Sequence, residues 1–378
     1  MRDIKKVLLI SNVPQTYRIP LFNEIDRQFR EMGIELKVVF ASDGYKRRKS
    51  KIDFSEIKFQ YEILKSLKFS FGNVEKTMFT YSGINRTISK FKPDKIIVSG
   101  FSLASLKIYF RSLFFKVSYV IWSGAIQFPG RFDSVFRKFE RRLLIKRASA
   151  FVSYGSKAKE YLVSLGAPAN RVFIGINTVD TSFFSLETNR IRVGLKPPEK
   201  KHLIYIGYLV PRKNVGKLIE IIERLSEKRD DFVLDILGDG SEKRMLEKMV
   251  EEKGLNDVVL FHGFVQKIDL PRYFAQGTCF LFQTDFDIWG LVLNEAMAAG
   301  VPVISSVTAG ATYDLISEGE TGFAADYNNL SDVLLKINMI LDQPELVEGI
   351  RKKAGASIEE KASLAISAKG FVDSVILE

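Results

Sequence analysis

The hydrophobic positions in the first half of the chain form short apolar runs separated by longer amphipathic stretches. Runs of four to six residues rich in Val, Ile, Leu and Phe are typical of strands covered on both faces. They predict strands at Lys6–Ile10, Glu35–Phe40, Asp94–Val98, Val117–Ile121, Ala150–Ser153 and Arg171–Ile174. Apolar residues at helical spacing predict helices at Leu21–Met32, Lys76–Phe91, Ser102–Phe115, Phe132–Arg147 and Lys157–Leu165.

The second half repeats this alternation. Its apolar runs predict strands at His202–Ile206, Phe232–Ile236, Val258–Phe261, Thr278–Phe282 and Val301–Ser305. Its amphipathic stretches predict helices at Val215–Lys228, Glu242–Lys253, Leu291–Ala299 and Leu330–Leu341. Two such successions predict an α/β protein of two doubly wound, Rossmann-like domains. Because ligands bind at the carboxyl ends of parallel strands, we expect the two domains to face a central cleft.

The domain boundary is predicted from composition. Residues 183–200 are polar and contain Pro197-Pro198, which suits an exposed linker. We therefore expect one domain at residues 1–182 and a second at residues 201–355. Residues 356–378 are expected to form a C-terminal helix that packs back on the first domain.

Charge is distributed unevenly along the 378 residues. Residues 1–180 hold 33 Lys and Arg against 15 Asp and Glu, whereas residues 181–378 hold 23 against 30. The first half is therefore predicted to face an anionic partner, either nucleic acid or a membrane surface. A single cysteine excludes an intrachain disulfide, and two histidines argue against a zinc or di-iron site. We expect neither a metal nor a cofactor.

The segment Thr284–Ser305 carries the strongest chemical signal. Asp287 precedes Glu295, and Gly290 opens a helix whose first residues include Leu291 and Val292. Free amides at the start of a helix bind phosphate, and a glycine there allows close approach. A carboxylate one turn further on, at Glu295, can accept both hydroxyls of a ribose. The alternative is an ordinary strand, loop and amphipathic helix with a capping aspartate.

This segment resembles the signature of the retaining, GT-B-fold glycosyltransferases of family 4, with Asp287 in place of the commoner glutamate at the first acidic position. Further matching motifs cover most of residues 200–330 and parts of 149–181. They are Ile206–Asn214, Ile236–Gly240, Val259–Gly263, Gly300–Ile304, Ala309-Gly310, Glu318–Phe323, Ser153–Gly155 and Asn177–Asp180.

The resemblance implies a role for individual residues. Asp287, Glu295 and Lys213 would be the catalytic set: Asp287 would hold the donor sugar, Glu295 the ribose, and Lys213 would neutralise the leaving diphosphate. The nucleotide-sugar would also be bound by Gly207, Arg212, Gly238, Val265, Gln266 and the backbone amides of Gly290, Leu291 and Val292.

The chain departs from the family pattern in three respects. Tyr208 stands where the family has a diphosphate-binding arginine. Arg212 is a candidate replacement, but neighbours on an extended loop point in opposite directions, which would separate it from Lys213. The loop at residues 11–18 also lacks the family's glycines, and the first half has no histidine.

Basic residues gather at two places in the first half. Tyr45–Lys51 reads as an exposed loop, and Phe132–Arg147 reads as an amphipathic helix with Arg137, Lys138, Arg141 and Arg142 among phenylalanines. These four residues are candidates for contact with anionic lipid headgroups or with an acceptor at the membrane surface. The alternative is a solvated helix face over a core.

Together these features predict a retaining, metal-independent hexosyl- or related glycosyltransferase. It would move sugar from a UDP- or GDP-sugar to a glycan acceptor, in particular a lipid-linked one, in cell-surface polysaccharide or lipopolysaccharide assembly. We expect it in the cytoplasm, peripheral at the inner face of the cell membrane. Alternatives are a sugar-nucleotide epimerase of the same fold, a catalytically inactive scaffold, or a non-enzymatic protein that binds an anionic surface or nucleic acid. Nucleic acid is not expected, because neither a stacking motif nor a recognition helix is apparent.

Overall fold

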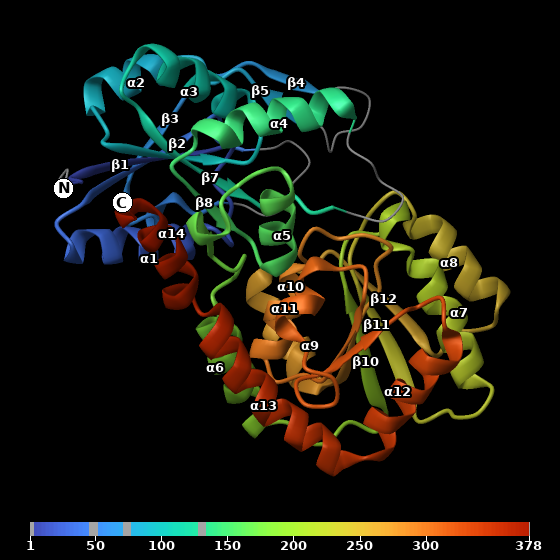
Figure 1. The fold of residues 1–378 in the computed structure, drawn as a ribbon. Helices are drawn as coiled ribbons and strands as arrows, with labels where there is room; N and C mark the ends of the chain where they lie inside the picture. Colours follow the sequence, from blue (N-terminus) through green and yellow to red (C-terminus); the bar gives the residue numbers. More distant parts are fainter. Residues whose placement is uncertain (1–3, 45–51, 71–76, 128–133, 378) are drawn as a thin grey trace. The chain divides into compact units, whose positions relative to one another are not determined.

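The computed structural model describes residues 4–44, 52–70, 77–127 and 134–377. The chain forms two compact units (Figure 1). Unit 1 comprises residues 1–179 and 364–378, and unit 2 comprises residues 180–363. Each unit is described by itself below.

Unit 1 is built on a parallel sheet of seven strands. In spatial order they are β3 (Gln60–Ile63), β2 (Glu35–Phe40), β1 (Lys6–Ser11), β6 (Lys95–Ser99), β7 (Ser118–Ser123), β8 (Ala150–Ser153) and β9 (Val172–Ile174). The strand order reverses between β1 and β6, which pair directly. Such a switch point leaves a crevice at the carboxyl ends of the strands.

Helices cover both faces of this sheet, because its central strands are apolar on both sides. One face packs against α1 (Ile19–Glu31) and α14 (Leu364–Ile376). The other carries α2 (Ile84–Phe91), α3 (Leu103–Phe114), α4 (Val135–Arg147) and α5 (Ser156–Ser164).

The C-terminal helix α14 is an integral part of unit 1. Its Phe371 is fully buried, with its ring centroid 5.0 Å from that of Trp122. A Cβ at Gly370 would lie 2.3 Å from the carbonyl oxygen of Ile174, so only glycine allows the helix this close to β9. Lys95 Nζ donates a 3.1 Å hydrogen bond to the carbonyl of Leu377. Helix α14 therefore packs in the same core as strand β1.

The helix predicted at Lys76–Phe91 was wrong in its first half. Thr77–Phe79 forms strand β5, which pairs antiparallel with β4 (Lys68–Ser70). Helix α2 begins only at Ile84, after Gly83 with φ +90°. A left-handed glycine interrupts helical backbone, and β-branched and aromatic residues favour a strand. The predicted basic loop Tyr45–Lys51 lies outside the described residues.

Unit 2 contains a second parallel sheet, of six strands. Their order is β12 (Val259–Gly263), β11 (Phe232–Leu237), β10 (Lys201–Ile206), β13 (Gly277–Phe282), β14 (Val303–Ser306) and β15 (Phe323–Ala325). One large core joins them to α7 (Val215–Ser226), α8 (Lys243–Glu252), α12 (Leu330–Asp342) and α13 (Pro344–Ala362). Shorter helices lie at α9 (Leu270–Gln276), α10 (Leu291–Ala298) and α11 (Gly310–Leu315).

Most of the segment expected to be a linker is a helix of unit 2, α6 (Thr181–Val193). The Asp180 carboxylate caps it by accepting a 3.0 Å hydrogen bond from the amide of Phe183. Phe184 is fully buried and packs edge-on against Phe274. The Asp180 cap and the burial of Phe184 therefore stabilise a helix here, although the polar composition suggested a linker.

Candidate functional site

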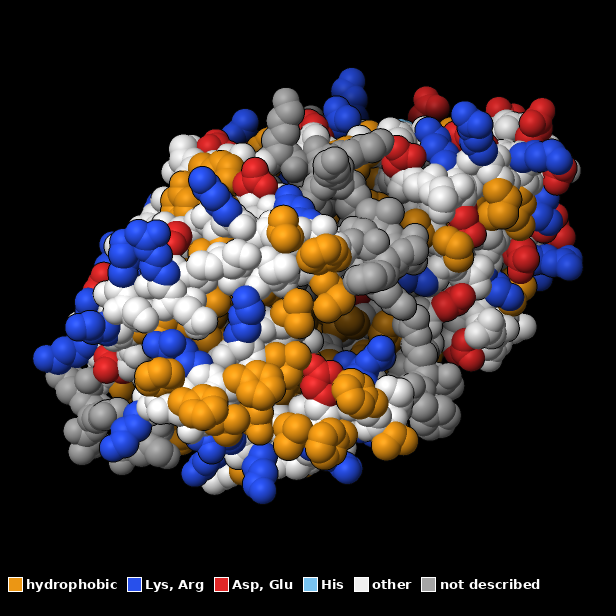
Figure 2. Space-filling view, turned by 90° about the horizontal axis from the view of Figure 1, so that it is seen from above, with side chains coloured by type: hydrophobic (Ala, Val, Ile, Leu, Met, Phe, Trp, Pro, Cys, Tyr) orange, Lys and Arg blue, Asp and Glu red, His pale blue; other side chains and the backbone are white. Residues whose placement is uncertain are grey.

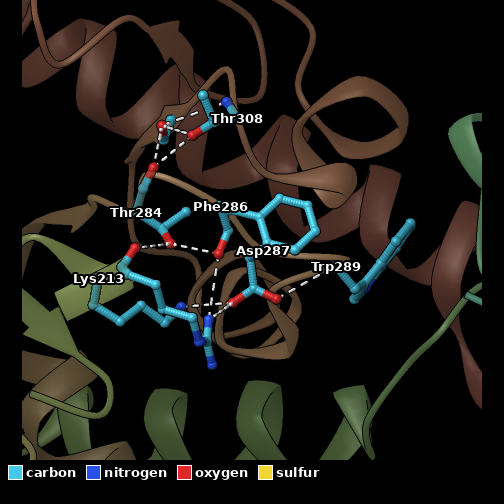
Figure 3. A network of polar contacts seen from close by, with 8 residues as sticks. Lys213, Thr284, Phe286, Asp287, Trp289 and Thr308 are labelled. Carbon is cyan, nitrogen blue, oxygen red and sulfur yellow. Dashed lines mark hydrogen bonds and ion pairs between the residues drawn. The ribbon is translucent and has the colours of Figure 1, made fainter. Parts of the chain in front are cut away.

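The loops that follow β10 and β13 bring a buried lysine against an aspartate (Figure 3). Lys213 Nζ donates a 2.6 Å hydrogen bond to Asp287 Oδ2. The other carboxylate oxygen, Oδ1, accepts a 3.3 Å hydrogen bond from the amide of Trp289. These are two of the three residues predicted to be catalytic, although 74 positions separate them in the chain. The two residues lie close together because their loops follow adjacent parallel strands, β10 and β13, which pair directly.

Arg212 reaches the same aspartate, contrary to the expectation from an extended loop. Its Nη1 lies 3.6 Å from Asp287 Oδ2 and donates a 3.3 Å hydrogen bond to the carbonyl of Phe286. The reason is local backbone geometry: Pro211–Lys213 forms a 3-10 turn rather than a strand. In a helical turn, consecutive side chains lie about 120° apart and can converge on one partner.

Further hydrogen bonds fix the two loops to each other. The carbonyl of Arg212 accepts from the amide of Asp285 at 3.0 Å and from Thr284 Oγ1 at 3.3 Å. Asn214 Nδ2 donates to both carboxylate oxygens of Asp285, at 3.0 and 3.1 Å. Ser306 Oγ donates to the carbonyl of Thr284 at 2.9 Å, which ties the next strand into the network. The cations are therefore held in place before any ligand arrives.

The charges at this cluster are strongly coupled. Lys213 is 6% exposed, and its ammonium lies 4.9 Å from the centre of the Phe282 ring. Burial by itself would raise the pKa of Asp287, but the neighbouring Lys213 ammonium, helped by Arg212, brings that pKa below its ordinary value. The site thus places two cations, Lys213 and Arg212, around one ionised carboxylate, and cations of this kind suit an anionic ligand.

Helix α10 begins directly beyond this cluster, at Leu291, and its N-cap residue is Gly290. This residue has φ +102°, and a Cβ there would lie 2.4 Å from the Phe282 ring. Trp289 Nε1 donates a 3.0 Å hydrogen bond to Asn294 Oδ1, and both side chains are buried. The first residues of α10, Leu291 and Val292, are partly exposed. The start of the helix is therefore fixed on one side and accessible on the other.

Glu295 lies one turn further along α10. Burial raises the pKa of its carboxyl to about 7, while the positive charge of Lys267 acts in the opposite direction. A carboxyl group whose pKa is raised to near 7 by its surroundings is typical of a functional site. No sequence motif pointed to Lys267, because its electrostatic effect on Glu295 depends on how the loop after β12 folds.

The glycines predicted to bind the nucleotide are required by close contacts of the backbone. A Cβ at Gly238 would lie 1.9 Å from the carbonyl oxygen of Gly207, and one at Gly240 would lie 2.1 Å from that of Leu209. These contacts draw together the loops after β10 and β11 at the same edge of the sheet as Lys213. Val265 and Gln266 occupy the loop after the neighbouring β12, just before a 3-10 turn at Lys267–Asp269.

Both histidines hydrogen-bond to one buried carboxylate. His202 Nδ1 and His262 Nε2 each lie 2.6 Å from an oxygen of Asp235, which is 4% exposed on β11. This bond to a buried carboxylate indicates a structural role for His262. Cys279 is a buried core residue of β13. Among the described residues, no group of three or more His, Cys, Asp and Glu could hold a metal ion.

Helix α4 presents the basic residues differently from the expectation. Arg142 is exposed, but Arg141 is directed inward: its guanidinium lies 5.0 Å from the centre of the Phe101 ring and donates to Tyr161 Oη. Lys138 is half-buried and Arg137 exposed. The helix begins at Val135, and Phe132 lies outside the described residues. In the part of the chain that the structure describes, no helix is long and apolar enough to cross a membrane.

Two doubly wound parallel-sheet units in one chain are the architecture of the GT-B class of fold. The crystal structure of HepE from Anabaena in complex with UDP aligns with a TM-score of 0.77 over 98% of this chain and 99% of that one, at 17% identity. The predicted fold class is therefore confirmed.

Residues 187–356 match the family described as glycosyl transferases group 1. The matched residues all lie within unit 2 and include the motifs at residues 200–330.

Two curated relatives show the extent of sequence similarity. Sulfoquinovosyl transferase SQD2 of Arabidopsis thaliana is 31% identical over 53% of this chain and 39% of its own length. The alpha-D-kanosaminyltransferase of Streptomyces kanamyceticus is 24% identical over 60% of each chain. The chain thus aligns with less than two thirds of the length of either relative.

Proposed function

We propose that this protein is a retaining glycosyltransferase that uses a nucleotide-sugar donor. The observation that carries the proposal is the cluster of Lys213, Arg212 and Asp287 beside the amide end of α10. It offers cations for a diphosphate and a carboxylate for sugar hydroxyls. The domain family and the UDP complex of HepE support the same donor chemistry.

The chemistry follows from where charge develops. When the bond between the anomeric carbon and the phosphate oxygen breaks, negative charge grows on the leaving diphosphate. The Lys213 ammonium, the Arg212 guanidinium and the amides of Leu291 and Val292 would stabilise that charge. Because these groups are already positioned, little reorganisation is needed. They would supply the positive charge that a metal ion supplies elsewhere, so we propose metal-independent transfer.

Glu295 and the loop at Val265 and Gln266 would hold the nucleoside. The ionised form of Glu295 can accept both ribose hydroxyls, and backbone groups of the loop can face the base. Uracil and guanine are the two bases that we propose to test first.

For the acceptor we propose a glycan, in particular a lipid-linked one, in cell-surface polysaccharide assembly. The chain would work in the cytoplasm, as a peripheral protein at the inner face of the membrane. The excess of basic residues before residue 181 supports this location.

A thermal-shift screen of nucleotide-sugars tests the donor. A ligand present at 100 times its dissociation constant should stabilise the protein by about 2.7 kcal/mol. The selected donor is then incubated with acceptors, with and without EDTA, and the product is examined by NMR. Transfer with retained anomeric configuration and no effect of EDTA is expected. Conversion of the donor into an epimer without any acceptor would instead favour the epimerase.

A further inference from the structure

Two neighbouring helices of unit 1 leave large apolar side chains in solvent. Phe114 is 81% exposed on α3, and Val135 and Phe136 are 87% and 77% exposed on α4. We call the full set the aromatic platform: Phe110, Leu113, Phe114, Phe115, Val135, Phe136, Phe139 and Leu143. Single exposed apolar residues are common in soluble proteins, but a cluster of this kind marks a contact surface.

The platform is carried by helices that are firmly packed. Helix α4 buries Leu144 and Ile145 on its inner side. Arg147 links it to α3 by donating hydrogen bonds to the carbonyl of Ser112 at 2.6 Å and to its hydroxyl at 3.2 Å. The inward-directed Arg141 adds the contacts with Phe101 and Tyr161 described above. The exposed phenylalanines therefore project from a fixed scaffold.

Basic side chains accompany the platform. Figure 2 shows hydrophobic side chains gathered in a band along one edge of this face, with Lys and Arg beside them. At the helical spacing of α4, Arg142 and Lys146 fall on the same exposed side as Phe139 and Leu143. On α3, the Arg111 guanidinium lies 4.7 Å from the centre of the Phe115 ring.

We propose that the aromatic platform docks on an anionic lipid bilayer. Its phenylalanines enter the boundary between headgroups and acyl chains, and Arg142 and Lys146 pair with the lipid phosphates. Phosphate binding alone would use the cations but leave the phenylalanines in water, whereas a bilayer accommodates both. The inference deepens the proposed peripheral location but does not depend on glycosyl transfer, so either can fail without the other.

Sedimentation of the full chain with vesicles tests the proposal in the absence of sugar nucleotide. Phosphatidylcholine vesicles with and without phosphatidylglycerol are compared at low and high salt. The variant Phe114→Ser/Phe136→Ser/Phe139→Ser should lose at least about tenfold in partitioning at both salt concentrations. Arg142→Gln/Lys146→Gln should lose about tenfold at low salt and little at high salt, because only the ionic part is screened. The control Met245→Ser/Leu335→Ser removes similarly exposed side chains of unit 2 and should behave like wild type.

A second measurement avoids any loss of stability from serine substitutions. The two native tryptophans, Trp122 and Trp289, are both buried, so Phe136→Trp adds a distinct exposed fluorophore. Its emission should shift to the blue on anionic vesicles and be quenched by brominated acyl chains. The proposal is overturned if wild type does not sediment, if the triple serine variant sediments like wild type, or if the introduced tryptophan is not quenched. A wild-type dimer that the triple variant converts to monomer would also overturn it, because the platform would then be a subunit interface.

Discussion

Lys213 and Asp287 form a 2.6 Å ion pair at the strand ends of unit 2, with the ammonium 6% exposed and Arg212 3.6 Å from the same carboxylate oxygen. An ammonium has three N–H donors, so one ammonium can contact a carboxylate and a phosphate together. The pair can therefore hold its geometry and bind a ligand at the same time.

Lys213→Met should lower turnover of the donor by about 10- to 100-fold, because it removes a charge-assisted contact of about 1.5–3 kcal/mol. The loss should appear in the affinity for UDP or GDP but not in that for the free nucleoside. Lys217→Met, a partly buried lysine on α7 that pairs with Glu220, is the matched control. Equal losses for nucleotide and nucleoside would place Lys213 away from the phosphates.

Arg212→Met should weaken turnover less than Lys213→Met, because Arg212 is more exposed and lies farther from Asp287. Tyr208 is 50% exposed and offers no cation. Tyr208→Arg should therefore add little to the wild type but recover part of the activity that Arg212→Met loses. The double-mutant cycle compares the kinetics of the wild type, the two single variants and the double variant. Purely additive effects would show that the two positions do not serve the same phosphates.

Nucleoside binding should depend on pH through Glu295, whose pKa is raised to about 7. The ionised form accepts ribose hydroxyls, so affinity should fall roughly tenfold from pH 8 to pH 6, following the ionised fraction. A free nucleoside is used because it has no phosphate that titrates in this range. Glu295→Gln should bind weakly at both pH values, and Glu295→Ala should lose most donor turnover without unfolding. A wild-type affinity that does not change with pH would contradict the assignment.

The same shift predicts an effect on stability. A carboxyl group with a raised pKa binds more protons in the folded state than in the unfolded state. Its contribution to the free energy of unfolding is therefore lost as the pH rises from about 4.5 to about 7. Denaturant unfolding should therefore show Glu295→Gln gaining free energy of unfolding relative to wild type at pH 8, and converging with it near pH 4.5.

Gly290→Ala should lower both stability and donor affinity. An alanine there would be strained by the backbone angle φ +102°, and its Cβ would clash with the Phe282 ring. That ring also lies against Lys213. We expect a loss of about 1–3 kcal/mol in the free energy of unfolding. Gly254→Ala is the control, since Gly254 has φ +65° but no atom within 4 Å of an added Cβ. If both variants behave alike, the space beside Phe282 does not matter.

Phe371→Ala should destabilise unit 1 by about 3–5 kcal/mol, because it leaves a cavity beside Trp122. Ile366→Ala on the same helix removes a side chain that is 45% exposed and should change stability by less than about 0.5 kcal/mol. Thermal or denaturant unfolding of the full chain measures both. A small effect of Phe371→Ala would mean that α14 contributes little to the core.

The sequence by itself determined the parts of this protein that depend on local pattern. Buried runs predicted the central strands of both sheets but not the edge strands β3 and β15. The resemblance of the segment with Asp287, Gly290 and Glu295 to a family signature supplied the candidate site as a prediction. Regular strands and helices repeat every few residues, so short windows are sufficient to detect them.

Only the tertiary structure decided features that depend on distant partners. The buried face of α6 becomes apparent when Phe184 meets Phe274, and α14 completes unit 1 through Phe371 and Trp122. The convergence of Arg212 and Lys213 on Asp287 required a 3-10 turn in one loop and hydrogen bonds to another. The raised pKa of Glu295 likewise results from burial in the folded chain. Polar side chains carry no periodic signal of their own, so their final partners are fixed by packing of the folded chain.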